Sequence, residues 1–202
     1  MKKLILSRTL LMAASLVSLG SFLIGQDTTA GSFTDSRDGH VYNTVKIGDQ
    51  VWLAQNLNFA TETGSWCLDD DPDGIQFGRF YNWEAAKNAV PPGWHLPSKE
   101  EFEIMLTTVG AEKLPYWGEV FNKLVEGGDS GFNASMTGSF KEEYSRRGSS
   151  AAFWSSDLWW FSSLLPFIER PLRLSLRAPD YINIGSGAES HFGFNVRCIK
   201  DE

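Results

Sequence analysis

Two helical patterns separated by a proline-rich corner dominate residues 80–102 of this sequence. In the first pattern, apolar residues recur at the spacing of one helix face: Phe80, Trp83, Ala86 and Ala89. Residues 91–93, Pro-Pro-Gly, end that helix because proline lacks the backbone donor and biases the preceding residue away from helical geometry. Ser98 then predicts the start of a second helix, because Glu101 completes a capping box ahead of the apolar Phe102.

Strand patterns flank this helix pair on both sides. Residues 41–52 predict a hairpin with Gly48-Asp49 at its turn, and residues 172–177 alternate apolar and polar side chains like a half-buried strand. A short helix over 116–125 and a terminal strand over 193–199 complete the expected elements. The sequence therefore predicts an α+β fold in which the two helices pack on small antiparallel sheets joined by long loops.

Residues 1–25 have the pattern of a secretory signal peptide. Basic residues occupy its first part: Lys2, Lys3 and Arg8. An apolar run with interleaved small residues follows over 10–24. A membrane-spanning helix needs about 20 apolar residues, so a cleaved signal is a better match than a retained anchor. We therefore expect an exported protein, secreted, periplasmic or displayed at the cell surface, with no membrane span after cleavage.

The rest of the chain has the size of one domain. Residues 26–34 are small and polar, which predicts a flexible leader, and residues 35–202 are long enough to bury a core. The net charge is −7 and the basic residues are scattered, whereas a nucleic-acid-binding protein needs a clustered cationic surface. We therefore expect no nucleic-acid partner.

Several motifs occur in the order typical of one bacterial family. They are DGHVYNTVKIGDQVWLAQNLN at 38–58, GRFYNWEAA at 78–86, PPGWHLPSKEEFE at 91–103, GFNASMTGSF at 131–140, FWSSD at 153–157 and GFNVRCIKD at 193–201. This set resembles the Fibrobacter succinogenes major paralogous domain family, whose members are secreted modules. The helix pair also resembles the formylglycine-generating-enzyme branch of the C-type lectin fold. These resemblances imply a C-type-lectin-like domain, and the function of the family is itself poorly defined.

An acidic loop carries the sharpest chemical signal in the sequence. Its residues at positions 1, 3, 5 and 6 of an EF-type calcium loop are Asp69, Asp71, Asp73 and Gly74. Calcium prefers several oxygen ligands that converge from a tight turn, so Asp69, Asp71 and Asp73 are candidate calcium ligands. However, Phe80 stands where a bidentate glutamate is needed, and Pro72 interrupts the loop. A solvated acidic turn is the competing interpretation, and the incomplete ligand set favours it.

Aromatic residues cluster after the FWSS motif. The family resemblance implies that Trp154 packs inside the core. The candidates for a ligand-binding surface follow it: Asp157, Trp159, Trp160 and Phe161. Aromatic faces stack on the C–H faces of sugar rings while an aspartate bonds the hydroxyls, and large aromatic residues also dominate protein interfaces. Packing of a loop against the core is the competing interpretation of the three aromatic residues.

The chain contains two cysteines, Cys67 and Cys198, and export permits a disulfide between them. The family resemblance points the other way, because related modules carry further cysteines near the acidic loop and at the position of Val90. If those are the natural partners, both thiols are unpaired here, so the pairing stays open. Arg197, beside Cys198 in the terminal strand, is expected to pair with a carboxylate of the helices.

The sequence contains no pattern that supports catalysis. The histidines, His40, His95 and His191, lack metal-ligand spacing, and His95 is expected to lie in the core. Ser155-Ser156-Asp157 lacks the nucleophile elbow of a hydrolase. We therefore interpret the chain as a non-enzymatic recognition or adhesion module that binds an extracellular glycan or protein. An oxidase-like enzyme of the formylglycine-generating branch and a structural module of the cell envelope are the alternatives.

Overall fold

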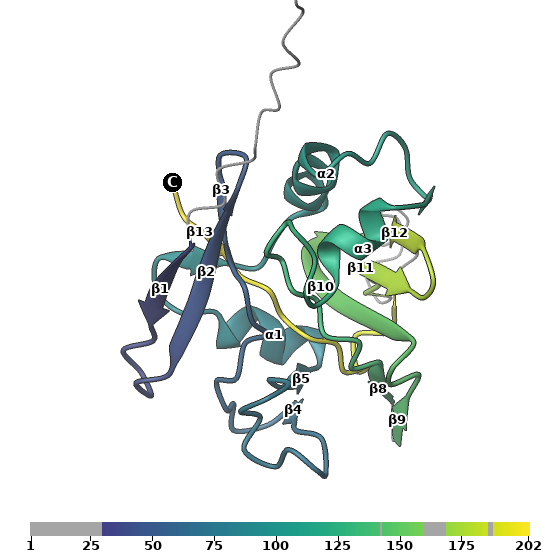
Figure 1. The fold of residues 1–202 in the computed structure, drawn as a ribbon. Helices are drawn as coiled ribbons and strands as arrows, with labels where there is room; N and C mark the ends of the chain where they lie inside the picture. Colours follow the sequence, from purple (N-terminus) through teal and green to yellow (C-terminus); the bar gives the residue numbers. More distant parts are fainter. Residues whose placement is uncertain (1–29, 142, 160–168, 186–187) are drawn as a thin grey trace, which may run out of the picture.

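The computed structural model describes residues 30–141, 143–159, 169–185 and 188–202. Within these ranges the protein has an α+β fold, in which short helices lie beside small antiparallel sheets (Figure 1). The expected fold class is confirmed at this level. The expected signal peptide, residues 1–25, lies outside the described residues.

Two main sheets organise the molecule. The first has the strand order β1-β2-β3-β13-β6, with β1 Ala30–Thr34, β2 Val41–Ile47, β3 Gln50–Leu53, β13 Ile199–Lys200 and β6 Trp94–His95. The second has the order β10-β11-β12-β7, with β10 Ser150–Leu158, β11 Pro171–Arg177, β12 Tyr181–Gly185 and β7 Tyr116–Trp117. Two small ribbons are formed by β4 Ser65–Trp66 with β5 Phe80–Tyr81, and by β8 Ser139–Lys141 with β9 Glu143–Ser145.

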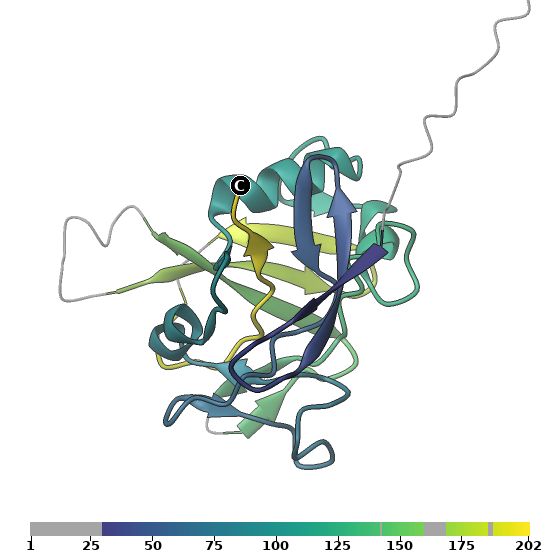
Figure 2. The ribbon, with the colours of Figure 1, turned by 90° about the vertical axis from the view of Figure 1, so that its left-hand side faces the viewer.

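Three helices occur among the described residues. They are α1 Trp83–Ala89, α2 Lys99–Thr108 and α3 Val120–Leu124. Figure 2 shows α2 lying beside the sheet of β10, β11 and β12, and residues of α2 contact all three strands. In the part of the chain that the structure describes, no helix has the length and apolar character needed to cross a bilayer.

Local sequence signals place the helix starts. The capping box predicted for α2 is confirmed, because the Ser98 side chain accepts from the backbone N–H of Glu101 while the Glu101 carboxylate accepts from the backbone N–H of Ser98. Helix α1 begins later than its apolar pattern predicts. Phe80 lies in strand β5, and the Asn82 side chain caps the helix by accepting from the N–H of Ala85 at 2.8 Å.

The predicted hairpin is confirmed. Strands β2 and β3 pair antiparallel, with Ile47 opposite Gln50. Gly48 adopts φ 61° in the turn, a conformation that glycine reaches without the steric cost other residues incur. The strand predicted over 172–177 is also confirmed, as β11, and it alternates buried and part-exposed residues along most of its length.

Part of the expected flexible leader is ordered. Residues 30–34 form β1 and pair with β2, with Phe33 opposite Tyr42. The Phe33 ring lies 5.0 Å from the Trp94 ring, centroid to centroid. Aromatic packing of this kind stabilises the added strand, and a polar composition alone does not reveal it.

Strand β10 separates the two hydrophobic clusters of the core. Its successive side chains point to opposite faces, so Phe153 joins the cluster of α2 and α3 while Trp154 joins the cluster of α1. The Trp154 indole N–H donates to the Tyr81 carbonyl at 2.6 Å, which satisfies its polar atom in the interior. The expectation that Trp154 packs inside the core is therefore confirmed.

Arg197 is the largest charged side chain that is fully buried. Its guanidinium and Nε donate to four oxygens: the carbonyls of Leu53, Phe132 and Asn133, and the side-chain oxygen of Asn56. The expected pairing with a carboxylate of the helices is wrong. Because the carbonyl dipoles at the end of β3 and at residues 132–133 converge on the guanidinium, they take the place of a counter-ion.

Candidate functional site

The structure brings Asp157 and Trp159 into one open groove of about 710 Å³. This aromatic groove lies where the start of α2 meets the ends of β10, β11 and β12. Its lining residues are Lys99, Glu100, Glu103, Asp157, Leu158, Trp159, Leu172, Ile184 and Gly185. The other two candidates, Trp160 and Phe161, lie outside the described residues.

Asp157 connects strand β10 to helix α2. Its Oδ2 accepts from the backbone N–H of Lys99, the first residue of α2, at 2.5 Å. A second link forms next to it, because the N–H of Ser156 donates to the carbonyl of Pro97 at 2.8 Å. A carboxylate at a helix start also interacts favourably with the helix dipole. Asp157 therefore positions this wall of the groove, and its Oδ1 accepts no hydrogen bond from the described residues.

Apolar side chains form the exposed surface of the groove. Trp159 is 38% exposed and Leu158 is 39% exposed, although most large apolar side chains among the described residues are buried. Leu172 and Ile184, which also line the groove, are buried. The backbone N–H of Trp159 donates to the carbonyl of Arg170 at 2.7 Å, which fixes the main chain at the groove edge. The result is an apolar surface that a flat ligand can contact.

Carboxylates from two elements border this apolar surface. Glu100 and Glu103 come from the first turns of α2, and Asp157 comes from β10. The ammonium group of Lys99 lies 3.1 Å from the Glu103 carboxylate, one helix turn away. Exposed pairs of this spacing contribute about 0.3–0.5 kcal/mol, so a ligand hydroxyl can compete for the glutamate. The groove thus offers hydrogen-bond acceptors beside an aromatic face.

The sequence did not reveal the residues that α2, β11 and β12 contribute to the groove. The alternation around Leu172 predicts a half-buried strand but not its neighbours. The hydrogen bond between Lys99 and Asp157 joins residues 58 positions apart, and no local pattern encodes such a contact. The aromatic cluster was the usable signal, because it pointed to the end of β10.

The acidic loop uses Asp71 internally. Asp71 is buried, and its Oδ2 accepts from the backbone N–H groups of Gln76 and Phe77 at 3.1 and 2.8 Å. Asp69 and Asp73 are exposed instead. The structure does not bring these three aspartates together as calcium ligands, because Asp71 turns inward to close its own loop.

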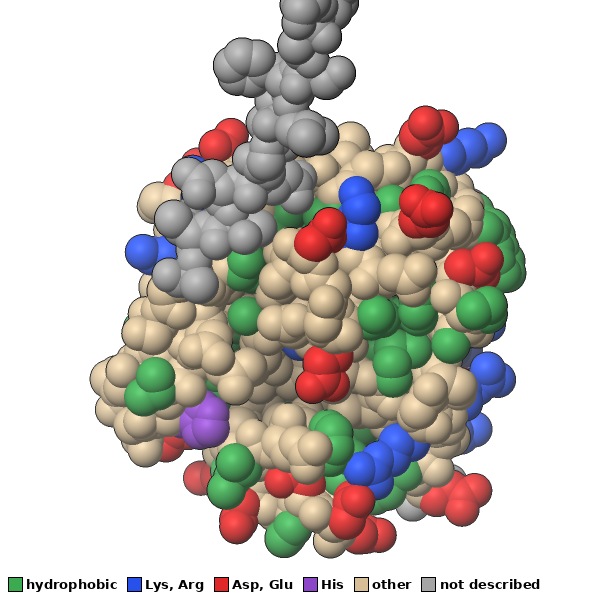
Figure 3. Space-filling model, in the orientation of Figure 1, with side chains coloured by type: hydrophobic (Ala, Val, Ile, Leu, Met, Phe, Trp, Pro, Cys, Tyr) green, Lys and Arg blue, Asp and Glu red, His purple; other side chains and the backbone are tan. Residues whose placement is uncertain are grey.

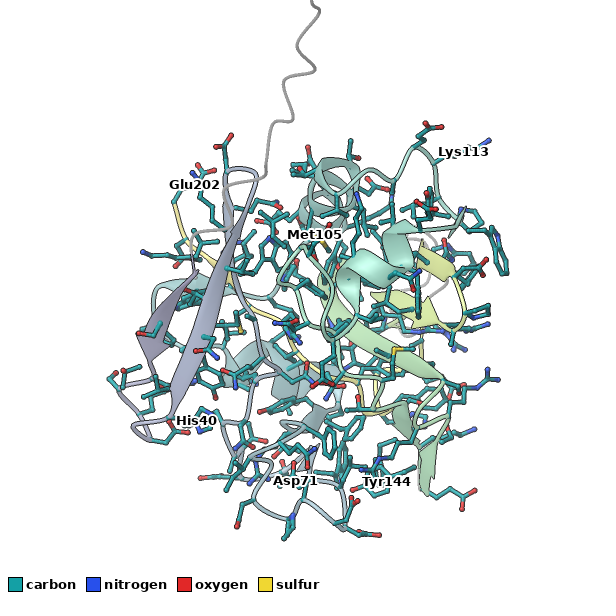
Figure 4. All side chains as sticks on the ribbon, viewed as in Figure 1. His40, Asp71, Met105, Lys113, Tyr144 and Glu202 are labelled. Atoms are coloured by element: carbon teal, nitrogen blue, oxygen red, sulfur yellow. The ribbon has the colours of Figure 1, made fainter. Side chains whose placement is uncertain are left out.

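Residues next to Asp71 link the acidic loop to the segment at residues 144–147. Asp70 lies 2.8 Å from the guanidinium of Arg147, and the Tyr144 hydroxyl donates to the carbonyl of Cys67. Figure 4 shows Asp71 and Tyr144 at the same end of the molecule. Across the described ranges, no group of three or more His, Cys, Asp or Glu side chains has an arrangement that could hold a metal ion.

Both cysteines are free thiols, so the disulfide considered between Cys67 and Cys198 is not formed. Cys198 is sealed in the hydrophobic cluster of α1, where burial raises its pKa. Burial also raises the pKa of the half-buried Cys67 thiol. Thiol nucleophiles and metal ligands act as thiolates, which a lowered pKa favours. Neither cysteine has the environment of a reactive thiol.

His95 does not lie in the core as expected, because its side chain is 40% exposed between two carboxylates. Its Nε2 lies 2.6 Å from Glu101 and its Nδ1 lies 2.7 Å from Asp201. Partial burial disfavours the charged ring, but the hydrogen bonds to both carboxylates outweigh it and raise the pKa of His95. The histidine therefore connects β6, α2 and the C-terminus electrostatically.

The comparison with protein families gives a match over residues 45–200 to the Fibrobacter succinogenes major domain. The chain belongs to this family. The Fibrobacter succinogenes major domain therefore extends from within β2 into β13, and it includes every residue of the aromatic groove. No curated protein and no solved structure matches the chain.

Proposed function

We propose that this member of the Fibrobacter succinogenes major domain family is an exported, non-catalytic recognition module that binds an extracellular glycan. The observation that carries the proposal is the exposed Trp159 indole beside the carboxylates of the aromatic groove. We further propose that its arrangement of helices on small antiparallel sheets with long loops is C-type-lectin-like. Residues 1–25 supply the export signal in this proposal.

The chemistry of the aromatic groove suits a sugar. The C–H face of a pyranose ring is apolar and packs on the face of an indole such as that of Trp159. Carboxylate oxygens of Asp157, Glu100 and Glu103 accept hydrogen bonds from sugar hydroxyls. The groove volume of about 710 Å³ also falls in the range usual for small-ligand sites. An open groove of this kind accommodates part of a chain and leaves its ends in solvent.

Two other functions have less support. An oxidase-like enzyme of the formylglycine-generating branch needs reactive thiols, whereas burial raises the pKa of both Cys67 and Cys198. A purely structural envelope module leaves the exposure of Leu158 and Trp159 unexplained. An extracellular protein partner uses the same aromatic surface, and the experiment below separates it from a glycan.

The test is to screen the protein without residues 1–25 on a panel of oligosaccharides, and then to measure the affinity of the best ligand by calorimetry. Trp159→Ala should weaken binding by about tenfold or more, because it removes the stacking surface. Trp117→Ala is the matched control, since Trp117 is 63% exposed on β7 and does not line the groove. It should leave the affinity unchanged.

Melting temperatures of both variants should stay close to that of the parent, which shows that the fold is intact. Glu100→Gln should lower the affinity for the same oligosaccharide without lowering the melting temperature of the protein, because Glu100 is an exposed hydrogen-bond acceptor. An empty glycan panel, or full affinity in Trp159→Ala, would overturn the proposal. In that case, capture of a protein partner that Trp159→Ala abolishes would assign the groove to protein recognition.

A further inference from the structure

A second groove, of about 350 Å³, is lined by cationic side chains, although the protein as a whole is acidic. Its cationic lining residues are Lys141, Arg146, Arg173 and Arg177. Its serine lining residues are Ser139, Ser145, Ser150 and Ser175. Among the described residues, no carboxylate lines this basic groove, although the chain carries a net charge of −7. The basic groove shares no lining residue with the aromatic groove.

Strand β11 builds one wall of the basic groove through its alternation. Leu174 lies in the core, whereas Arg173, Ser175 and Arg177 lie on the opposite side of the strand and line the groove. The ribbon of β8 and β9 contributes Lys141 from another side. Cationic side chains from segments more than 30 positions apart therefore meet only in the folded protein.

Aromatic rings lie beside Lys141 and Arg177, two of these cations. The Lys141 ammonium lies 5.1 Å from the ring centroid of Phe192, and the Arg177 guanidinium lies 5.5 Å from that of Tyr181. A ring stabilises the charge without engaging all of its N–H donors, so donors stay available to a ligand. Burial and repulsion from Arg177 lower the pKa of Arg173.

Two adjacent arginines have different environments. Arg147 forms an exposed ion pair with Asp70 at 2.8 Å and does not line the groove. Arg146 lines the groove and has φ 61°, in the left-handed region that few non-glycine residues adopt. The carbonyl of Arg146 accepts from the N–H groups of Ser149 and Ser150, each at 3.1 Å, and these bonds hold the tight turn. The pair therefore offers a test residue and a control side by side.

We propose that the basic groove binds the sulfate or carboxylate groups of an acidic polysaccharide. Arginine, lysine and serine supply the N–H and O–H donors that oxyanions accept, and guanidinium groups do so in a fork geometry. A hollow of about 350 Å³ is at the small end of ligand sites, which suits a charged sugar unit of a longer chain. Single-stranded nucleic acid instead needs an extended cationic track with stacking platforms.

The test uses sulfated dextran and unmodified dextran of equal length, with the protein lacking residues 1–25. The parent should bind sulfated dextran, and inorganic sulfate should compete with it. Rising salt should weaken the interaction because it screens the charges. The double variant Arg146→Asn, Arg177→Gln should bind at least about tenfold more weakly, since both side chains are exposed and their loss does not disturb the core. Arg147→Gln should keep the parental affinity.

Several outcomes would overturn this proposal. They are equal binding of unmodified dextran, parental affinity in the double variant, an equal loss in Arg147→Gln, and binding of inorganic sulfate without binding of the sulfated polymer. Equal affinity for single-stranded DNA would assign the groove to polyanions in general and would overturn its assignment to a polysaccharide. Trp159→Ala should leave the binding of sulfated dextran unchanged, so failure of the glycan proposal for the aromatic groove is seen separately.

Discussion

Arg197 shows at the scale of one residue how this protein tolerates a buried charge. Burial lowers the pKa of Arg197 to about 9, so the guanidinium stays protonated at neutral pH. Four oxygens accept hydrogen bonds from the guanidinium, and the guanidinium carbon Cζ lies 4.8 Å from the Phe132 ring centroid. The side chain thus links the loop after Ala54 to the loop at 132–133.

We predict that Arg197→Leu destabilises the protein by about 3–5 kcal/mol, because several buried oxygens lose their donors at once. Urea unfolding followed by tryptophan fluorescence measures the change. Arg147→Leu removes an exposed ion pair with Asp70 and a cation–π contact with Phe77, and it should cost about 1 kcal/mol. A loss of similar size in the two variants would show that the carbonyl contacts of Arg197 do not stabilise the fold.

His95 shows how charge connects secondary-structure elements. It lies in β6, while Glu101 belongs to α2 and Asp201 follows β13. Partial burial opposes ionisation of Glu101, but hydrogen bonds from Ser98 and the charge of His95 prevail and lower its pKa. The Glu101 carboxylate is therefore ionised at the pH at which His95 titrates. The strength of the ion pair between His95 and Glu101 then depends on whether His95 is protonated.

We predict that stability from His95 is present in mildly acidic solution and fades in basic solution. The pKa of His95 is raised in the folded state, so its contribution is complete below the unfolded-state pKa of about 6.5. The contribution is lost as the pH rises through the higher folded-state pKa. Solvent screens this half-exposed site, so the effect should stay below about 1 kcal/mol.

The measurement is the free energy of unfolding against pH for the parent and for His95→Gln. The gap between the two curves should close on the basic side. Asp201→Asn made in the His95→Gln background should add no further pH dependence in that range. A gap that is constant with pH would contradict the proposed charge coupling.

The C-terminal segment connects the two halves of the whole molecule. Strand β13 pairs with β3 on one side and β6 on the other, so it lies inside the five-stranded sheet. Residues just before it bridge to other elements, because Phe194 pairs with Tyr81 and Asn195 pairs with Phe153. The last residues of the chain therefore complete structure that begins near the N-terminus.

We predict that deletion of residues 199–202 prevents cooperative folding. The deletion separates β3 from β6, removes Ile199 from the core and breaks the contact between Asp201 and His95. Circular dichroism and size-exclusion chromatography should report an expanded chain without a sharp melting transition. Deletion of Glu202 alone is the control, since this residue is exposed at the surface (Figure 4), and it should melt like the parent. A native melting temperature after the longer deletion would contradict this role of β13.

The distribution of charge over the surface is also a property of the whole molecule. On the face shown in Figure 3, side chains of both signs are interspersed, in keeping with the scattered charges of the sequence. The basic groove arises because the fold brings together cations of β8, of the turn between β9 and β10, and of β11. Composition predicts the average charge of a surface, whereas the fold decides where charge is concentrated.

Features that depend on neighbouring residues could be predicted from the amino-acid sequence. The capping box at Ser98, the turn at Gly48 and the alternation of β11 were all predictable, because they rest on hydrogen bonds and side-chain directions within a few positions.

Features that need partners far away in the sequence became visible in the folded protein. Those are the carbonyl oxygens around Arg197, the strand at 30–34 and the two grooves. Each depends on backbone groups and rings that distant parts of the chain contribute. Burial lowers the local dielectric constant, which strengthens their hydrogen bonds and electrostatic interactions. Local sequence patterns do not encode contacts between residues that are far apart in the chain. The residues that line the two grooves could therefore be identified only in the folded protein.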